Sequence, residues 1–303
     1  MVNVTTVTGF LLLGFSEVRE LQLVHATLFL LVFLVALTGN LLIVTVTILD
    51  RRLHTPMYFF LRNLSLIDVC YISTTVPKSI LNSLTNVNSI SLPACVVQVF
   101  LVIFLGGSEL ALLTVMSHDP CASMLAASWL SGSLISVMYT ASTFSLSFCG
   151  PNDIHQFFCE GPQLLRLTCS ASHIAEHVSL TLALCLSFLC FVLIVILYVR
   201  IFRAVVRMPA AEGRAKAFST CLPHLVVVTL FTSSGFFAYL KPISDSPSAL
   251  DLLVSVFYAV VPPTLNPLIY SLRNRDMKAA MNKLLGQESF GKEKLCQVNF
   301  SPS

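Results

Sequence analysis

Leu21–Leu49 reads LQLVHATLFLLVFLVALTGNLLIVTVTIL and contains no Asp, Glu, Lys or Arg. A helix of about 20 apolar residues crosses the hydrocarbon of a bilayer, so this stretch is long enough to span a membrane. Further charge-free runs of similar length follow it along the chain: Ser79–Ser108, Cys121–Asn152, His177–Val199, Ala217–Leu240 and Leu252–Leu272. The sequence therefore predicts a chain surrounded largely by lipid.

One more apolar stretch, Pro56–Val76, carries Arg62 near one end and Asp68 in its middle, and it raises the expected number of spans to seven. Backbone groups in lipid must be hydrogen-bonded within a helix or a closed barrel. Runs of this length without alternation of period two favour helices. We expect an all-α fold, a bundle of seven transmembrane helices at residues 23–272, between an outer segment at 1–22 and a cytoplasmic part at 273–303.

The composition agrees with a membrane protein. Of 303 residues, 55% are hydrophobic and 11% are charged, which is more apolar surface than a soluble core of this size could bury. The net charge of +3 follows from the distribution of Lys and Arg between the two sides of the membrane, and it does not indicate a nucleic-acid partner.

The basic residues predict the orientation. With seven spans, 14 of the 18 Lys and Arg residues fall on one side, and the positive-inside rule makes that side cytoplasmic. The amino terminus is then extracellular and the carboxyl terminus cytoplasmic, in a multi-pass protein of the plasma membrane. The remaining four residues fall on the outer side: Arg19, Lys78, Arg166 and Lys241.

Two terminal features follow from this topology. Asn3-Val4-Thr5 is a glycosylation acceptor sequence in the outer segment, so Asn3 is expected to carry a glycan. After the last span, residues 274–285 place Met277, Met281 and Leu284 on one face, which is typical of a short helix lying in the membrane surface. A frayed basic tail is the alternative reading of that segment.

Four cysteines face the oxidising outer compartment under this topology. Cys95 lies at the outer end of the third span, and Cys149, Cys159 and Cys169 follow at intervals of ten residues in one long loop. Four cysteines permit two disulfides in three connectivities, and their spacing does not choose among them. A bridge from Cys95 into the loop would fold the loop over the mouth of the bundle.

Several motifs resemble those of vertebrate odorant receptors, within the rhodopsin-like G-protein-coupled receptors. They match in order over nearly the whole chain, and together they are highly specific. The resemblance implies a receptor without enzymatic activity, which binds small odorants and signals through a stimulatory, olfactory-type heterotrimeric G protein. The residues that carry it are Gly39-Asn40, Pro56–Leu61, Leu64–Asp68, Lys216–His224 and Pro263–Asn274.

The resemblance also implies individual roles. The family's disulfides correspond to Cys95–Cys159 and Cys149–Cys169, and Cys95–Cys169 is an alternative that the spacing allows. Pro267 removes a helical donor, and Asn266 can hydrogen-bond the freed backbone or a neighbouring helix, which predicts a hinge for switching, whereas the simpler reading of Pro267 is a static kink. The switch residues that we infer are Asp119, His224, Asn266, Pro267 and Tyr270.

Asp68 and Glu109 are acidic residues deep within the predicted spans. A carboxylate in a bilayer costs a few kcal/mol unless it is protonated, paired or hydrated. We expect the two to share a proton or a sodium ion near the middle of the bundle, with carboxyl groups that serve structure alone as the alternative. No other cofactor and no metal site is expected.

The ligand should bind between the outer halves of the helices. Small and apolar residues of the third span leave space there, and aromatic residues of the sixth span complete an apolar cavity, which suits small, mostly apolar organic molecules. Packing of helices is the simpler role for the two glycines. The predicted ligand-binding residues are Val102, Ile103, Gly106, Gly107, Phe236, Tyr239, Val256 and Ala259.

The chain departs from the family after the third span. Odorant receptors continue there through Asp-Arg-Tyr into a basic cytoplasmic loop, but this chain reads Met116-Ser117-His118-Asp119-Pro120-Cys121 and enters the next span almost at once. The absence of the arginine, the tyrosine and the loop predicts weak or absent coupling to the G protein. A non-signalling variant, retained in the endoplasmic reticulum or not, is therefore the second hypothesis. A transporter is a less favoured third one, because the chain shows no internal repeats.

Overall fold

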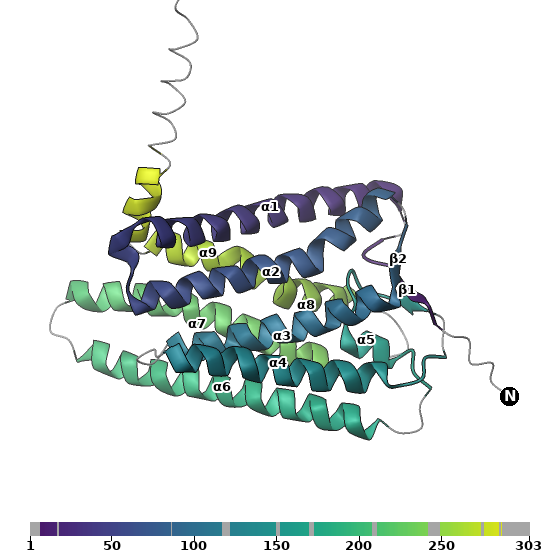
Figure 1. Ribbon diagram of the computed structural model, residues 1–303. Coiled ribbons are helices and arrows are strands. Elements are labelled where there is room, and N and C mark those ends of the chain that lie inside the picture. Colours follow the sequence, from purple (N-terminus) through teal and green to yellow (C-terminus); the bar gives the residue numbers. More distant parts are fainter. Residues whose placement is uncertain are drawn as a thin grey trace, which may run out of the picture.

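The computed structural model describes residues 7–16, 18–85, 87–116, 122–149, 152–169, 173–207, 211–241, 249–273, 276–284 and 286. Long helices lie side by side in one bundle, with a small sheet at the end where the amino terminus emerges (Figure 1). The long helices are α1 (Arg19–Leu49), α2 (Pro56–Thr85), α3 (Leu92–Met116), α4 (Ala122–Phe144), α6 (Ile174–Val206) and α7 (Ala211–Leu240). Shorter elements are η1 (Arg51–Leu53), α5 (Gly161–Leu165), α8 (Ala249–Ala259) and α9 (Val261–Arg273).

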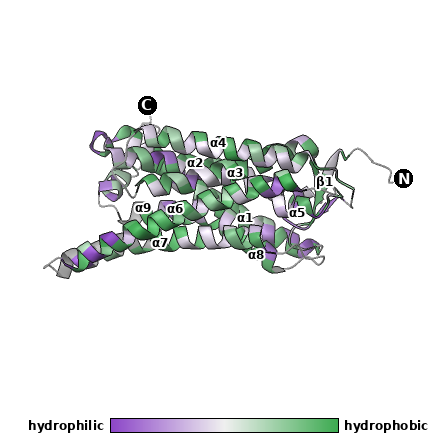
Figure 2. Ribbon diagram, turned by 90° about the horizontal axis from the view of Figure 1, so that it is seen from below, coloured by the Kyte–Doolittle hydropathy of each residue, from purple (hydrophilic) through white to green (hydrophobic). Residues whose placement is uncertain are grey.

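Six helical stretches within the described residues are long and apolar enough to cross a membrane, and Leu225–Leu240 in α7 adds a shorter apolar helix. Hydrophobic residues make up most of the length of the long helices, and hydrophilic residues are more frequent toward the two ends of the bundle (Figure 2). Leu130 in α4 and Ile174 in α6 are 70% and 72% exposed, as expected of side chains that face lipid. The fold is thus the expected bundle of membrane helices.

The seventh crossing consists of two helices. The predicted span Leu252–Leu272 is divided at Val260, where α8 ends before α9 begins. Pro262 and Pro263 have no backbone N–H, and a proline also disfavours the helical conformation of the residue before it. These effects account for an interruption at the start of α9.

The sequence did not predict the three-stranded sheet. It consists of β1 (Gly9–Leu12), β2 (Ser89–Ser91) and β3 (Asp153–Ile154), with β1 in the centre. β1 pairs antiparallel with β2 and parallel with β3. The amino-terminal segment is therefore ordered against the loop after α2 and the loop after α4. We call the end of the bundle that carries this sheet the sheet end.

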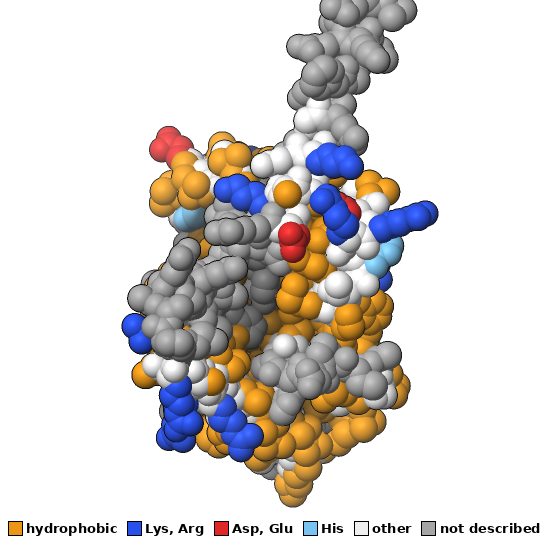
Figure 3. Space-filling view, turned by 90° about the vertical axis from the view of Figure 1, so that its left-hand side faces the viewer, with side chains coloured by type: hydrophobic (Ala, Val, Ile, Leu, Met, Phe, Trp, Pro, Cys, Tyr) orange, Lys and Arg blue, Asp and Glu red, His pale blue; other side chains and the backbone are white. Residues whose placement is uncertain are grey.

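The opposite end, which we call the basic end, carries Arg51 and Arg52 in η1 and Arg203 in the last turn of α6. Figure 3 views the molecule from this end and shows Lys and Arg side chains spread around it. Residues 276–284 form the helix expected after the last span. On this helix Met277 is buried, and Met281 and Leu284 pack against the main core, so its apolar face points toward the bundle.

Two helix boundaries do not coincide with the boundaries that the charge pattern suggests. The charge-free run Ser79–Ser108 is not one span, because α2 ends at Thr85 and β2 lies before α3 begins at Leu92. Charged residues did not mark this turn, because the residues between the two helices include neutral polar ones such as Asn88 and Ser89. α1 also begins at Arg19, earlier than the expected boundary at residue 23.

Candidate ligand-binding site

A cavity of about 220 Å³ lies between the helices toward the sheet end. α3, α4, α6 and α7 form most of its wall, while Tyr71 of α2 and Tyr258 of α8 close its sides. Much of the rest of the lining is aliphatic or glycine, and the residues that line the cavity include no Asp, Glu, Lys, Arg or His within the described part of the chain. This cavity can enclose a small organic molecule mainly by dispersion contacts.

Six of the eight predicted ligand-binding residues line this cavity: Val102, Ile103, Gly106, Gly107, Phe236 and Tyr239. A Cβ atom on Gly106 would lie 3.6 Å from the rings of Phe231 and Tyr71, so the glycine leaves room between α2, α3 and α7.

The other two predicted residues do not line the cavity. Ala259 is fully buried in the main core, and Val256 packs against that core. α8 is rotated so that Tyr258 takes the position facing the cavity. The apolar pattern alone could not give this rotation, because α8 has apolar residues on several faces.

The cavity wall also has polar groups that sequence reasoning missed. Four tyrosines contribute to it, Tyr71, Tyr139, Tyr239 and Tyr258, and only Tyr239 was expected. Thr232 of α7 also lines the cavity, and its Oγ1 is buried without a hydrogen-bond partner in the described part of the chain. No pattern in the sequence distinguishes Thr232 from the other threonines of the spans.

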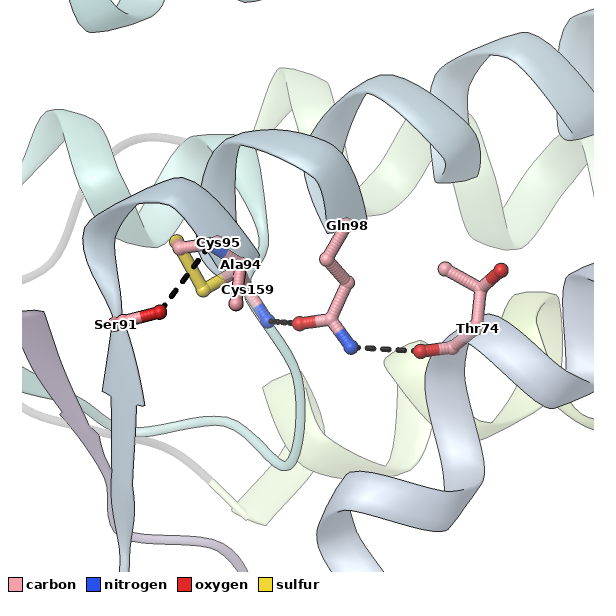
Figure 4. Close-up of a disulfide and its surroundings, with 6 residues drawn as sticks. All are labelled: Thr74, Ser91, Ala94, Cys95, Gln98 and Cys159. Atoms are coloured by element: carbon pink, nitrogen blue, oxygen red, sulfur yellow. Dashed lines mark hydrogen bonds between the residues drawn. A yellow bond between two sulfur atoms is a disulfide. The ribbon is translucent and has the colours of Figure 1, made fainter.

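One disulfide attaches the long loop between α4 and α6 to α3 at the sheet end, and a second joins two points within that loop. Cys95 of α3 is bonded to Cys159, and Cys149 is bonded to Cys169, which is the pairing that the family resemblance implied. Gln98, one turn after Cys95, donates to the Thr74 carbonyl of α2 at 2.7 Å and accepts from the Cys159 backbone N–H at 2.8 Å (Figure 4). This side chain joins α2, α3 and the loop.

A buried acid of the same loop contacts α8. Glu160 directly follows Cys159 and is 4% exposed. Tyr258 donates a hydrogen bond to its carboxyl group, and the Oγ of Ser255 lies 3.3 Å from its Oε1. Burial raises the pKa of Glu160 to about 7, the hydrogen bonds from Tyr258 and Ser255 lower it, and the nearby Asp251 raises it. Glu160 thus links the loop to the wall of the cavity.

Asp68 and Glu109 lie together in the middle of the bundle, as expected, and both are fully buried. Asn266 of α9 stands between them, with its Nδ2 donating to Asp68 Oδ2 at 3.1 Å and to Glu109 Oε1 at 3.2 Å. Glu109 Oε2 is buried without a hydrogen-bond partner among the described residues. The cluster therefore has one carboxylate oxygen available for a proton or a cation.

Pro267 lies inside α9, and a side chain of α1 supplies the hydrogen-bond donor that this proline removes from the helix. Because Pro267 has no N–H, the carbonyl of Pro263, four residues earlier, loses its helical donor. Asn40 Nδ2 donates to this carbonyl at 2.8 Å. A Cβ atom on Gly39 would lie 3.0 Å from Pro267 Cβ, so glycine allows this close contact between α1 and α9.

The remaining predicted residues fall outside what the structure describes. Asn3 and Asp119 are outside the described residues, and so are the side chains of His224 and Tyr270. α3 ends at Met116 and α4 begins at Ala122, so the short connection between these helices agrees with the sequence.

Comparisons with known proteins give one consistent result. The sequence profile described as Olfactory receptor matches residues 29–142 and 126–288. Olfactory receptor 14J1 of Homo sapiens is 50% identical over 314 aligned positions, which cover 98% of this chain and 98% of that protein. Olfactory receptor 14A16 of Homo sapiens is 52% identical, and the alignment covers 94% of this chain and 98% of that protein.

The fold has a solved counterpart in the crystal structure of squid rhodopsin. The two superpose with a TM-score of 0.64 at 15% sequence identity, covering 90% of this chain and 88% of that chain. The alignment with olfactory receptor 14J1 also gives the number of positions that this chain lacks relative to that protein. It has 314 positions but includes 98% of the 303 residues here, so about 17 positions have no counterpart in this chain.

Proposed function

Because this chain belongs to the olfactory receptor family, we propose that it binds small, mostly apolar odorants in the cavity between its membrane helices. The observation that carries this proposal is the largely apolar cavity, whose described lining bears no charged group. A small apolar molecule gains dispersion contacts with this lining. Because the molecule carries no charge, its binding buries no ionic group without a counter-charge.

Thermal unfolding of the purified receptor in lipid nanodiscs, with a panel of odorants, tests this proposal. We expect several members to raise the melting temperature, because a ligand that binds only the folded state stabilises it. Gly106→Leu would fill the cavity and remove this effect, whereas Gly286→Leu, made outside the cavity, would preserve it. If no odorant stabilises the receptor, or if Gly106→Leu does not matter, the proposal is wrong.

We propose that the sheet end is extracellular. The disulfides at this end and the Lys and Arg residues at the basic end support this orientation. Asn3 would then carry a glycan that a glycosidase removes and that is lost in Asn3→Gln. Asn299→Gln, in the cytoplasmic tail, would leave the glycan unchanged. A glycan that depends on Asn299 would reverse the orientation.

The family's partner is a heterotrimeric G protein, and we propose that this chain couples to it weakly or not at all. The support is the lack of the Asp-Arg-Tyr segment and of the loop after it, together with the aligned positions that have no counterpart. Cells with this chain alone should show no rise in cyclic AMP on addition of an odorant. Insertion of the corresponding segment from olfactory receptor 14J1 should restore the response. A rise without the insertion would contradict the proposal.

A second candidate is a variant that does not reach the cell surface, and the same missing segment favours it. Staining of intact and of permeabilised cells distinguishes a non-signalling receptor at the cell surface from one that is retained inside the cell. Surface staining without cyclic AMP indicates a non-signalling receptor, whereas staining that requires permeabilisation indicates retention in the endoplasmic reticulum.

We also propose that Asp68 and Glu109 hold a shared proton or a sodium ion. The buried Asn266 bridge and the free Glu109 Oε2 support this proposal. If sodium binds, its addition raises the melting temperature of the receptor, and Asp68→Asn and Glu109→Gln each abolish the effect. If a proton is shared, both variants alter stability without any sodium dependence. If both variants are as stable as the unmodified receptor, Asp68 and Glu109 hold neither a shared proton nor a sodium ion.

A further inference from the structure

The cavity is covered at the sheet end. Tyr139 of α4 and Tyr239 of α7 both line it, and their ring centroids lie 6.2 Å apart. On the loop side, Gly161 of α5 packs directly against the Tyr139 hydroxyl, and Glu160 accepts a hydrogen bond from Tyr258. Within the described part of the chain, the loop between α4 and α6 contributes no residue to the lining. Tyrosine rings and the loop thus lie between the cavity and the water at this end.

The exposure of the lining residues shows where the cavity reaches the surface. Among the described lining residues, Ser131 of α4 and Leu186 of α6 are exposed, and the others are buried or half-buried. Leu186 is 38% exposed although it lines a cavity. A residue that borders a cavity and is also exposed marks the place where the cavity meets the surface. This place lies between α4 and α6.

The helices α4 and α6 run side by side (Figure 1) and are in contact near the sheet end. There the hydroxyl oxygens of Ser142 in α4 and Ser179 in α6 lie 2.8 Å apart. Leu186 follows Ser179 by seven residues, while Ile135 and Ser131 precede Ser142 by seven and eleven. These intervals are close to two or three helical turns, so the residues face the same gap as the two serines. Farther from the sheet end, this gap is part of the cavity.

The other edge of α6 is in contact with α7. Phe188 of α6 and Phe236 of α7 have ring centroids 6.3 Å apart. Because Phe188 is two residues from Leu186, the two side chains point to nearly opposite sides of the helix. The exposed part of the lining is therefore on the side of α6 that faces α4.

This opening lies at the depth of the hydrocarbon. Leu186 is 12 residues from the start of α6 at Ile174, and Ser131 is 13 residues from the end of α4 at Phe144. At the helical rise per residue, both lie about 20 Å from the sheet end of their helices. A hydrocarbon core about 30 Å thick surrounds the bundle at that depth. Apolar side chains that are 38–63% exposed surround the opening: Leu134, Met138, Leu182 and Leu189.

We propose that odorants enter and leave the cavity from the bilayer, through the opening bordered by Ser131, Ile135 and Leu186, which we call the lateral opening. This inference rests on the proposed odorant-binding function and adds the route to that site. An apolar molecule leaves water for hydrocarbon, so the membrane holds most of the ligand beside the lateral opening. A route affects the rates of entry and exit by the same factor, because the affinity depends only on the free and bound states.

Fluorine NMR tests the route on the complete receptor in nanodiscs, with fluorobenzene and fluorocyclohexane as probes. It measures both the affinity and the rate at which bound and free probe exchange. Ser131→Phe places a ring in the lateral opening, so exchange should slow about tenfold while the affinity stays within about twofold. Ala126→Phe is the matched control, since Ala126 is exposed on α4 and does not line the cavity, and it should change neither quantity.

Leu186→Ala tests the opposite direction. It shortens an exposed side chain at the lateral opening, so exchange should become about threefold faster with little change in stability. Leu189→Ala is its control, because Leu189 is an exposed leucine of the same helix that does not line the cavity. Exchange in this control should equal that of the unmodified receptor. If Ser131→Phe does not fold, the pair of alanine variants decides the question.

The outcomes distinguish the route from the proposed function. If neither probe and no odorant of the panel binds the unmodified receptor, odorant binding in this cavity is wrong, and the route is wrong with it. If the probes bind but exchange is the same in Ser131→Phe and Leu186→Ala, the cavity binds ligands that enter elsewhere. A loss of affinity without slower exchange in Ser131→Phe would make Ser131 part of the binding site and would also overturn the route.

Discussion

At the scale of single residues, the receptor stabilises its helices by supplying donors where prolines remove them. Asn40 illustrates this, because its side chain is fully buried and donates both to Ala36 in its own helix and to Pro263 across the bundle. The proline at position 267 would otherwise leave the Pro263 carbonyl without a donor. Asn40 therefore allows a proline within a membrane helix where no water is available.

We expect Asn40→Leu to lower the stability of the receptor by about 1–3 kcal/mol, because it leaves the Pro263 carbonyl buried and unpaired. Thermal unfolding in nanodiscs measures the change. Asn63→Leu is the matched control, since among the described residues the Asn63 side chain bonds only the Phe59 carbonyl of its own helix, at an exposed position, and the change should alter stability by at most about 0.5 kcal/mol. Equal losses in both variants would contradict the role of Asn40.

At the scale of elements, the loop between α4 and α6 is held to the bundle at several points. The Cys95–Cys159 disulfide and Gln98 attach it to α3, and Glu160 attaches it to α8. The loop also contributes β3 to the sheet. Because these contacts come from different helices, the loop keeps those helices at fixed distances around the mouth of the cavity.

The two disulfides should differ in their contribution to stability. Cys95 and Cys159 are 64 residues apart and Cys149 and Cys169 are 20 apart, so the first closes the longer loop and removes more entropy from the unfolded chain, by about 1 kcal/mol. Replacement of each pair by alanine should therefore lower the melting temperature more for Cys95–Cys159. A larger loss for Cys149–Cys169 would show that local strain or contacts outweigh loop entropy.

At the scale of the whole molecule, stability should depend on pH through Glu160. Its pKa is raised from 4.5 to about 7 mainly by burial, so the folded state favours the protonated form. The stabilisation that the folded state gains from binding this proton is fully present below about pH 4.5 and is lost as the pH rises through about 7. We expect the receptor to lose about 3 kcal/mol across this range.

Glu160→Gln should remove most of this pH dependence, since glutamine keeps the shape of the side chain and does not titrate. Melting temperatures of both proteins across the same buffers measure the difference, in which the titration of groups common to both proteins cancels. If the variant keeps the slope of the unmodified receptor, another group is responsible.

The sequence predicted the parts of the molecule that depend on one strong physical effect. Charge-free length gave the helices, and the family motifs gave the disulfide pairing and the proximity of Asp68 and Glu109, whereas the bridge that Asn266 makes between them was not predicted. Features that depend on the packing of several elements were not predictable. The rotation of α8, which turns Tyr258 rather than Val256 toward the cavity, and the partners of Glu160 follow from three-dimensional contacts that no local pattern records.

The central position of β1 in the sheet has a consequence for synthesis. Leu11 leaves the ribosome early, but its partners Ser89 and Asp153 are translated much later, after two and four helices have been made. Residues 9–11 can therefore pair with β2 only after α2 has been made, and residues 11–12 can pair with β3 only after α4 has been made. The sheet can thus be completed only when the first four long helices have been made, whereas α6 to α9 are translated after its last strand.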